Sequence, residues 1–341
     1  METVRLGRTD LVVNKTAFGA LPIQRVAMEE AKRILRRAVD GGINFIDTAR
    51  GYSDSEEKLG AALDPSLRKQ IVLATKARPS DGAGLAQSLD TSLKTLRTDY
   101  VDILQAHNPK RMPAPDDGSG YYEAFLEARR AGKIRFVGLT AHSVDVAIQA
   151  AKSGLYDTVQ FPFSYLSTGK DLEVPGICRD ADVGFLAMKA LAGGLIRNIP
   201  AAFAFMRGHE NVLPLWGVQK MEELEEFLAL TASPPVWNAD MAASVEKDRR
   251  ELSAAFCRGC GYCMPCPTGI DISLAARMEL YLGRQPLQRV MEECGEKMAK
   301  AADCTQCGEC RSRCPYGLDT PKLVRTNTEF YRDYLRRHGK A

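Results

Sequence analysis

The chain has 341 residues, of which 45% are hydrophobic and 26% charged, and its formal net charge is +3 at pH 7. This length allows two domains, one of them with a sizeable core, and the composition is that of an ordinary globular protein. So small a net charge argues against a nucleic-acid partner or an anionic membrane surface.

No segment of the sequence suits export or membrane insertion. The first residues contain neither a basic leader nor an apolar signal segment, and the longest apolar stretch, residues 188–206, is interrupted by Lys189, Arg197 and Pro200. We therefore expect a cytoplasmic protein without a membrane span.

The first two thirds of the chain alternate between short apolar runs and amphipathic segments. Residues 4–13 alternate around Gly7-Arg8-Thr9-Asp10, which predicts a short hairpin. The strands expected after it are residues 15–19, 44–47, 71–76, 100–107, 135–140, 158–161, 183–188 and 212–215. The expected helices are residues 29–40, 55–63, 85–96, 121–131, 144–153, 169–180, 199–207 and 221–230.

Eight strands that are each followed by a helix predict a (β/α)8 TIM barrel in residues 1–230, within the α/β class. The competing interpretation is an open, doubly wound sheet that binds a dinucleotide. That fold calls for a G-x-G-x-x-G turn after the first strand, where this chain has Gly19-Ala-Leu-Pro22. The barrel is therefore the expected fold.

Four polar residues stand where expected barrel strands end, the rim at which barrel enzymes build their active sites. They are Asp47, Tyr52, Lys76 and His107. A tyrosine with a pKa of ~10 is a poor proton donor at neutral pH unless a positive charge lowers that pKa. We expect Lys76 to supply this charge and Asp47 to hold Lys76. His107 would orient a carbonyl oxygen or relay a proton, with Tyr52 as the general acid–base.

The last third of the chain is organised differently. Residues 231–240 are turn-rich and predict a linker. Helices are expected at residues 241–255, 272–282, 287–302 and 320–337. Residues 241–341 therefore form a second domain, small and mainly helical.

Eight of the ten cysteines stand in two runs within this domain. The runs are Cys257, Cys260, Cys263 and Cys266 before Pro267, and Cys304, Cys307, Cys310 and Cys314 before Pro315. Such triplets, each followed by a fourth cysteine before proline, are typical of bacterial [4Fe-4S] sites, because a cubane needs thiolates from several sides. The alternatives are zinc, which favours paired CxxC units, and disulfides, which favour exported proteins. We expect the two remaining cysteines, Cys178 and Cys294, to be buried and inert.

The two runs resemble those of two-cluster bacterial ferredoxins, in which the fourth cysteine of each run binds the other cluster. The resemblance implies a ferredoxin-like domain with two [4Fe-4S] clusters. One cluster would be held by Cys257, Cys260, Cys263 and Cys314, and the other by Cys304, Cys307, Cys310 and Cys266. The first run departs from the family, since two residues instead of three precede Cys266.

Residues 1–230 resemble the aldo-keto reductase family. The Asp47-Thr-Ala-Arg-Gly-Tyr52 segment, Lys76 and His107 match the family's catalytic tetrad, and the hairpin, Gly193-Gly194 and Gln160 agree with it. The resemblance implies an oxidoreductase that interconverts a carbonyl and an alcohol on a small-molecule substrate. Together the two parts resemble aldo-keto reductases that carry a C-terminal iron–sulfur domain.

The expected cofactor is a nicotinamide, with Gln160, Gly217 and Lys220 as its contacts. The family grips the adenosine 2′-phosphate of NADP with basic and hydroxyl side chains after the last strand. Glu223 stands here in place of the phosphate-binding arginine, and Phe227 in place of the adenine-contacting asparagine. A carboxylate repels a phosphate, so we expect NAD rather than NADP.

The clusters leave three interpretations open, because a hydride carries two electrons whereas a cluster accepts one at a time. In the first, the clusters of an ordinary carbonyl reductase brace the domain or dock a partner. In the second, a flavin or a radical substrate occupies the barrel, and the clusters relay single electrons between it and a ferredoxin or another electron-transfer protein. In the third, the barrel is a non-enzymatic platform, against which the tetrad argues. We also expect the first cysteine run to lie near the rim that carries Tyr52 and His107.

Overall fold

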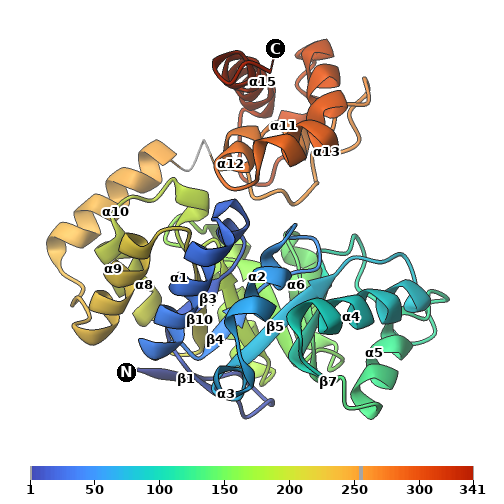
Figure 1. Ribbon diagram of the computed structural model, residues 1–341. Helices are drawn as coiled ribbons and strands as arrows, with labels where there is room; N and C mark the ends of the chain where they lie inside the picture. Colours follow the sequence, from blue (N-terminus) through green and yellow to red (C-terminus); the bar gives the residue numbers. More distant parts are fainter. Residues whose placement is uncertain (1, 253–255, 341) are drawn as a thin grey trace.

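The computed structural model describes residues 2–252 and 256–340, and it consists of a barrel with a helical domain above one end (Figure 1). Eight parallel strands close the barrel in the order β10-β3-β4-β5-β6-β7-β8-β9. The strands are β3 (Ala17–Gly19), β4 (Phe45–Asp47), β5 (Val72–Ala77), β6 (Val101–His107), β7 (Ile134–Thr140), β8 (Thr158–Pro162), β9 (Gly184–Met188) and β10 (Val212–Gly217). The predicted barrel is confirmed, and each strand lies within two residues of its expected bounds.

Helices surround the barrel. They are α1 (Met28–Asp40), α2 (Ser55–Ala62), α3 (Pro65–Arg68), α4 (Gly82–Leu96), α5 (Tyr121–Arg130), α6 (Val144–Lys152), α7 (Val174–Asp180), α8 (Ile199–Arg207) and α9 (Met221–Ala232). The helix expected at 169–180 is divided into a 3-10 turn, Gly169–Leu172, and α7. Pro175 lies in the first turn of α7, where a missing N–H costs no hydrogen bond, so the proline favours a new helix start at this point.

The predicted hairpin, formed by β1 (Thr3–Arg5) and β2 (Val12–Asn14), closes the N-terminal end of the barrel. Its apolar side chains, such as Leu6 and Val13, share one core with side chains from the barrel strands, including Phe45. Gly7 turns the hairpin with φ +52, and a Cβ there would lie 2.5 Å from the carbonyl oxygen of Asp182. Only glycine therefore allows the hairpin to approach β9 this closely.

The second part of the chain is mainly helical, as predicted. Its helices are α10 (Ala239–Leu252), α11 (Ile272–Ala275), α12 (Met278–Leu282), α13 (Leu287–Lys300), α14 (Glu309–Ser312) and α15 (Thr320–Arg337). Residues 253–255, the end of the helix expected at 241–255, lie outside the described residues. The helix expected at 272–282 is broken between α11 and α12, at Ala276 and Arg277.

Helix α10 packs on the barrel, although the sequence interpretation assigned it to the second domain. Val245 belongs to the barrel's core, and Asn198 donates a hydrogen bond to the Ser244 hydroxyl at 2.9 Å. The division of the chain at residues 231–240 stays a prediction. Among the described residues, no helix is both long and apolar enough to cross a membrane.

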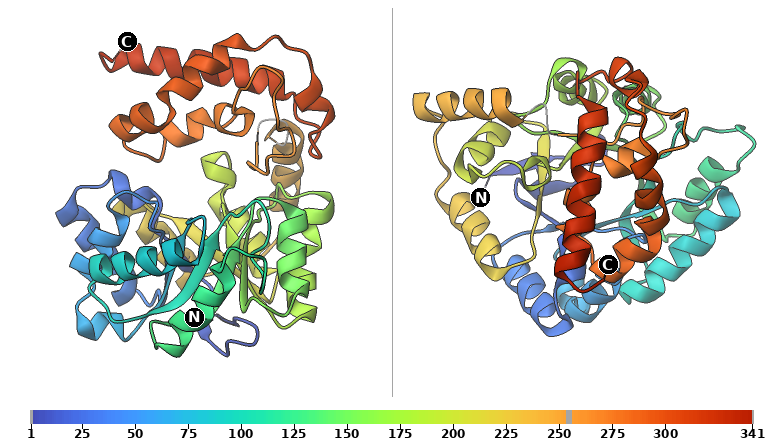
Figure 2. Two further views of the ribbon diagram at one scale, coloured as in Figure 1. Left: turned by 90° about the vertical axis from the view of Figure 1, so that its right-hand side faces the viewer. Right: turned by 90° about the horizontal axis from the view of Figure 1, so that it is seen from above.

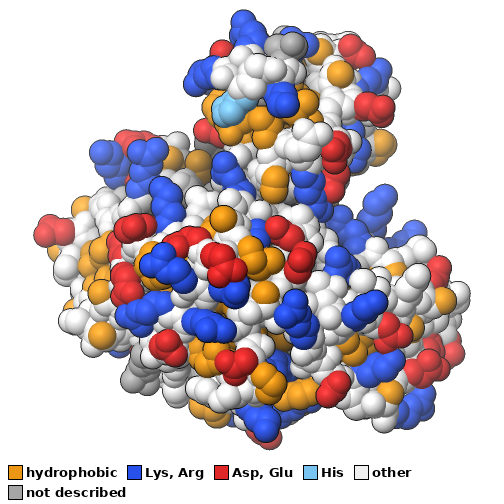
Figure 3. Space-filling view, viewed as in Figure 1, with side chains coloured by type: hydrophobic (Ala, Val, Ile, Leu, Met, Phe, Trp, Pro, Cys, Tyr) orange, Lys and Arg blue, Asp and Glu red, His pale blue; other side chains and the backbone are white. Residues whose placement is uncertain are grey.

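The helical domain lies over the end of the barrel opposite the hairpin, which is the end where the parallel strands finish (Figures 1 and 2). The Arg289 guanidinium donates to the Gly51 carbonyl at 2.7 Å, and Arg25 of the barrel donates to the Gly283 carbonyl at 2.5 Å. On the face shown in Figure 3, Lys and Arg side chains lie near the junction of the two parts. The domain therefore roofs the rim at which the sequence places the candidate active site.

Candidate active site and cluster sites

The four predicted polar residues come together at the C-terminal rim of the barrel. Lys76, in β5, places its Nζ 2.6 Å from Asp47 Oδ2 and 3.4 Å from the Tyr52 hydroxyl. The ring of Tyr52 meets the ring of His107 edge to face, with centroids 5.9 Å apart. Asp47 and Lys76 are both buried. The tetrad is therefore a contiguous group with its two ions away from solvent.

The buried Asp47 carboxylate is fully engaged. Besides Lys76, it accepts hydrogen bonds from Gln105 Nε2 at 3.1 Å and from Gln160 Nε2 at 3.2 Å. Lys76 Nζ also donates to the Thr48 carbonyl at 2.6 Å. A buried ion pair is tolerated when further hydrogen bonds satisfy both partners, and this network meets that condition.

Burial dominates the protonation of the site. It raises the pKa of Tyr52; Lys76 lowers that pKa, as expected, but does not overcome the burial. Burial lowers the pKa of Lys76, but Asp47 and Tyr52 together raise it above its usual value. Burial, with Lys76 and Arg78, holds the pKa of His107 well below its usual range. At neutral pH the site therefore contains a protonated phenol, an ammonium and a neutral imidazole.

The predicted cofactor residues fall into two groups. Gln160 lies beside the tetrad, and its Oε1 is buried with no hydrogen-bond partner among the described residues. That acceptor fits a carboxamide N–H of a nicotinamide. Gly217 ends β10, and Lys220 precedes α9. Both residues are exposed, and no hydrogen bond within the described chain joins either of them to the tetrad.

The residues that depart from the family have structural roles here. Glu223 Oε2 accepts the backbone N–H groups of Gln219 at 2.9 Å and Lys220 at 3.2 Å, so it caps the N-terminus of α9. Phe227 is buried and stacks on Trp216 with ring centroids 4.9 Å apart. A carboxylate thus occupies the helix end where the family binds a phosphate, and an aromatic core contact replaces an adenine contact.

None of the ten cysteines, all of which lie in the described residues, forms a disulfide. A cavity in the second domain is lined by Cys266, Cys304, Cys307 and Cys310, with apolar walls that include Ile272 and Val324. This is the ligand set that the ferredoxin resemblance implies for one cluster, with Cys266 supplied by the other run. A soft, apolar cavity ringed by four thiols fits an iron–sulfur cluster.

The other four cysteines also lie near one another. Burial raises the pKa of Cys260, and Cys257 and Cys314 raise it further. Burial likewise raises the pKa of Cys263 to about 12, with Cys257 and Cys260 adding to the rise. Within the described ranges, no three His, Cys, Asp or Glu side chains stand close enough to hold a single metal ion. Thiols arranged around a four-iron cubane are spread more widely than the ligands of one ion, so this finding is compatible with a cluster.

The first cysteine run docks on the barrel rim, as the sequence predicts. Lys189, which follows β9, donates from Nζ to the Arg258 carbonyl at 3.2 Å, next to Cys257. The Tyr262 hydroxyl lies 2.9 Å from that of Ser143, in the loop after β7. Arg258 is itself buried, where its guanidinium pairs with Asp171 at 3.1 Å. Together these contacts bring the first cysteine run to the ends of β7, β8 and β9.

Sequence reasoning missed the basic residues that gather between the two parts. Lys189, Arg258, Arg277 and Arg284 come from separate loops of both domains. Burial, with Arg277 and Arg284, lowers the pKa of Lys189 well below its usual value. The one available signal was Arg258, a long cation inside the CxxCxxC run.

The remaining two cysteines are buried, as predicted. Cys178 is buried in the barrel core, where burial raises its pKa to about 12, and Cys294 is buried in the core of the second domain. Neither belongs to the two thiol groups described above.

Comparison with known proteins agrees with this architecture. Residues 15–210 match the Aldo/keto reductase family, and residues 256–319 match a 4Fe-4S dicluster domain. The uncharacterized oxidoreductase YrpG of Bacillus subtilis is 32% identical over 228 residues, 58% of this chain and 68% of that protein. L-galactose dehydrogenase of Arabidopsis thaliana is 31% identical over 214 residues, 58% of this chain and 67% of that protein.

Solved structures show the same fold. An aldo-keto reductase from Klebsiella pneumoniae, in complex with NADPH, is 24% identical with a TM-score of 0.60, and the match covers 72% of this chain and 94% of that one. Because the family match spans more than half of the 341 residues and the rim carries the geometry described above, this chain belongs to the aldo/keto reductase family, with a 4Fe-4S dicluster domain after its barrel.

Proposed function

We propose that this oxidoreductase interconverts a carbonyl and an alcohol on a small molecule, with Tyr52 as the general acid–base. The observation that carries the proposal is the position of Lys76 Nζ, which lies within hydrogen-bonding reach of both Asp47 and the Tyr52 hydroxyl. Because Asp47 fixes the ammonium, a positive charge stays beside the phenol whenever Tyr52 loses its proton.

The chain's own groups would act on the carbonyl oxygen. The neutral imidazole of His107 donates a hydrogen bond that orients this oxygen, and the Tyr52 hydroxyl gives up its proton as negative charge develops there. Lys76 stabilises the resulting tyrosinate. The raised pKa of Tyr52 keeps the phenol protonated for reduction, and the same groups act in reverse during alcohol oxidation.

A nicotinamide cofactor supplies the hydride when it is bound. We propose that Gln160 Oε1 accepts a hydrogen bond from its carboxamide, since this buried oxygen has no partner within the described residues. Gly217 and Lys220 would lie beside the adenosine half. We propose NAD over NADP, because Glu223 places a carboxylate on the helix N–H groups that would otherwise hold a 2′-phosphate.

A second function, electron relay by the clusters, is favoured by the docking of the first cysteine run on the rim. The Arg258 carbonyl, beside Cys257, accepts from Lys189 at the end of β9. When bound at the two thiol groups, clusters supply single electrons. We propose that residues 1–230 work as the catalytic part and residues 241–341 as the relay part, whose first helix, α10, packs on the barrel. The outside partner would be a ferredoxin or a similar electron carrier.

Replacing Tyr52 by Phe tests the acid–base role, because it removes the proton and keeps the ring. We expect kcat for carbonyl reduction to fall about 10²- to 10⁴-fold, with iron content and melting temperature unchanged. The control is Tyr121→Phe, whose buried hydroxyl donates to the Ala77 carbonyl at 3.0 Å outside the tetrad. Turnover by Tyr52→Phe within a few fold of wild type would disprove the proposed role.

Anaerobic purification tests the relay. Its first readout is the cofactor that accompanies the protein, since a flavin absorbs visible light and a nicotinamide does not. Its second is the electron paramagnetic resonance signal of the clusters after addition of NADH alone, of NADH with reduced ferredoxin, and of reduced ferredoxin alone. Clusters that stay unchanged under all three conditions would contradict the relay and leave them a structural role.

A further inference from the structure

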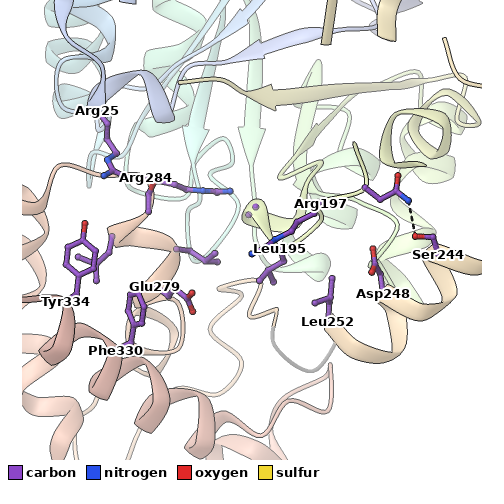
Figure 4. Close-up of a pocket in the computed structure, with 16 residues that line it drawn as sticks. Arg25, Leu195, Arg197, Ser244, Asp248, Leu252, Glu279, Arg284, Phe330 and Tyr334 are labelled. Carbon is purple, nitrogen blue, oxygen red and sulfur yellow. Dashed lines mark hydrogen bonds between the residues drawn. The ribbon is translucent and has the colours of Figure 1, made fainter. Parts of the chain in front are cut away.

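A cavity of about 780 Å³ lies between the barrel rim and the second domain (Figure 4). The barrel contributes Gly193, Gly194 and Arg197, which follow β9, together with Arg25. The second domain contributes a run from Glu279 to Arg284 and two aromatic side chains of α15. Neither part of the chain alone would enclose this space, so the cavity exists because the domain roofs the rim.

Arg284 reaches the barrel at a pair of glycines. A Cβ at Gly193 would lie 3.2 Å from Leu280 Cδ1 and 3.5 Å from Arg284 Nη2, and one at Gly194 would lie 3.8 Å from the same nitrogen. Both glycines have positive φ values, 84° and 99°. Side chains at these positions would be strained and would crowd the guanidinium, so the loop accommodates an arginine supplied by the other domain.

The guanidinium of Arg284 has no counterion among the described residues. Among residues 2–252 and 256–340, no hydrogen bond or ion pair involves its guanidinium, although its backbone carbonyl accepts from Gln24 at 3.3 Å. Two acids line the same cavity: the Asp248 carboxylate accepts the hydroxyl of Tyr165, and Glu279 forms no ion pair in the described structure. Arg284 is partly buried, and a guanidinium that lines a cavity without a counterion can pair there with an anionic ligand.

The positive charge of Arg284 also interacts with Tyr52 of the tetrad. Burial lowers the pKa of Arg284 to about 10, so the group is still a cation at neutral pH, and Tyr52 is the ionisable group that opposes this effect. The positive charge of Arg284 also helps to lower the pKa of Lys189. Gln24, which donates to the Arg284 carbonyl, accepts a hydrogen bond from the Ser53 hydroxyl at 2.8 Å, and Ser53 follows Tyr52 in the chain. Arg284 therefore lines a cavity whose wall is joined to the loop that carries the phenol.

We propose that Arg284 binds a carboxylate or phosphate of the carbonyl substrate, so that the enzyme acts on anionic carbonyl compounds and the second domain supplies the residue that selects them. A guanidinium pairs with either oxyanion through two parallel hydrogen bonds. The inference rests on the proposed carbonyl chemistry. It goes beyond that chemistry by naming the substrate class and the residue that recognises it.

The kinetic test compares charged and neutral substrates of similar size. The pairs are succinic semialdehyde with butanal, and pyruvate with butane-2,3-dione, each assayed with wild type and with Arg284→Gln. We expect kcat/KM for the charged members to fall about 10- to 100-fold and that for the neutral members to change little. Arg284→Lys should recover part of the loss, because it restores the charge without the paired geometry. Arg311→Gln, an exposed arginine of α14, is the control for loss of a charge.

A binding test separates this inference from the proposed function. Calorimetric titration with oxamate, a non-reducible analogue of a keto acid, needs no turnover. We expect its Kd to rise about 10- to 100-fold in anaerobic Arg284→Gln holoprotein of normal iron content. This result would support the inference even if the wild type reduced none of the four carbonyls, an outcome that would count against the proposed function alone.

Two results would overturn the inference. Oxamate could fail to bind wild type, or it could bind Arg284→Gln as tightly as wild type. If the variant at the same time bound NADH more weakly, Arg284 would be assigned to the phosphates of the cofactor. If Arg284→Gln does not fold, the same comparisons are made with Arg284→Lys, for which we expect a smaller loss in the same direction.

Discussion

The barrel site and the cysteine sites are built in opposite ways. Asp47, Lys76 and His107 stand at the ends of neighbouring strands, and the barrel's backbone register fixes the distances between them. The cysteines of the two runs stand on loops and on α14, a helix of only four residues, and each thiol group draws on both runs. The barrel thus assembles its site from the chain alone, whereas the second domain needs something to hold its loops together.

The hydrophobic cores of the barrel and of the second domain also differ in how far they depend on the cysteines. The barrel has one large apolar cluster that reaches from its strands to α10, and a second cluster that its strands share with the hairpin. The second domain's main core is small, and two of the cluster cysteines, Cys263 and Cys310, are among its buried members. A domain whose ligands belong to its core gains stability when the metal binds, because binding to the folded state alone shifts the folding equilibrium.

The largest effect that follows from this contrast is expected on removal of iron. Anaerobic chelation should unfold residues 257–338 while the barrel strands keep their structure, and holoprotein should contain about eight iron and eight sulfide ions per chain. Hydrogen exchange followed by mass spectrometry is the measurement. Exchange should become fast in α13 and α15 and stay slow in β5 to β8.

Cys294→Ser provides the control, since Cys294 lies in the core of the second domain but outside both thiol groups. It should retain the full iron content. A value near four iron ions would mean that one site is vacant, and zinc in place of iron would contradict the cluster assignment. If α13 and α15 stayed protected after chelation, the contrast between the two parts would be wrong.

The next largest effect is expected for Lys76→Met. Lys76 lowers the pKa of Tyr52 against the effect of burial, so its loss should raise that pKa further. The rising limb of alcohol oxidation should move to higher pH, and kcat should fall about 10²-fold or more. The variant also leaves Asp47 buried without its cation, which costs about 3–5 kcal/mol of stability.

The double variant Lys76→Met, Asp47→Asn separates these two consequences. It removes the orphaned charge and should recover most of the melting temperature without recovering turnover. A single variant whose pH profile matches that of the wild type would show that Lys76 does not act on Tyr52, whatever its effect on stability.

The sequence predicts the barrel and its tetrad well for a physical reason. Strand and helix periodicities are local, and a parallel barrel brings all strand ends to one rim, so Asp47 and His107 could be assigned to one site without coordinates. Local pattern did not reveal the break at Arg277, whose guanidinium packs within 2.5 Å of the position of a Cβ on Gly259. That break reflects contact with the first cysteine run rather than the propensity of residues 272–282.

The contacts between the barrel and the second domain also could not be predicted from the sequence. Arg284 resembles any surface arginine in the linear sequence, and only the docked domain shows that it lines a cavity between the two parts. The structural role of Glu223 could not be predicted from the sequence either. The sequence indicates a carboxylate where a phosphate would bind, but not that this carboxylate caps α9.

A moderate effect is expected on the pH dependence of carbonyl reduction below neutral pH. The pKa of His107 lies well below 6.5 because of burial and the cations Lys76 and Arg78, so the neutral imidazole persists as pH falls through 6.5. We expect kcat/KM for a neutral carbonyl to change less than about two-fold between pH 8 and pH 6. An inflection near pH 6.5 that disappears in His107→Gln would show that the imidazole titrates at its ordinary value.

The smallest effect tests the cofactor preference at the edge of the barrel. Glu223→Gln removes the negative charge but keeps a side-chain oxygen able to accept the N–H groups of Gln219 and Lys220, so the cap on α9 should survive. Loss of the repulsion should lower KM for NADPH about 3- to 10-fold and leave KM for NADH nearly unchanged. Glu222→Gln, which removes a neighbouring charge in the same turn without touching the cap, should have less effect. If Glu223→Gln leaves the ratio of the two KM values as in wild type, another part of the site sets the preference, and the capping carboxylate acts only on the helix.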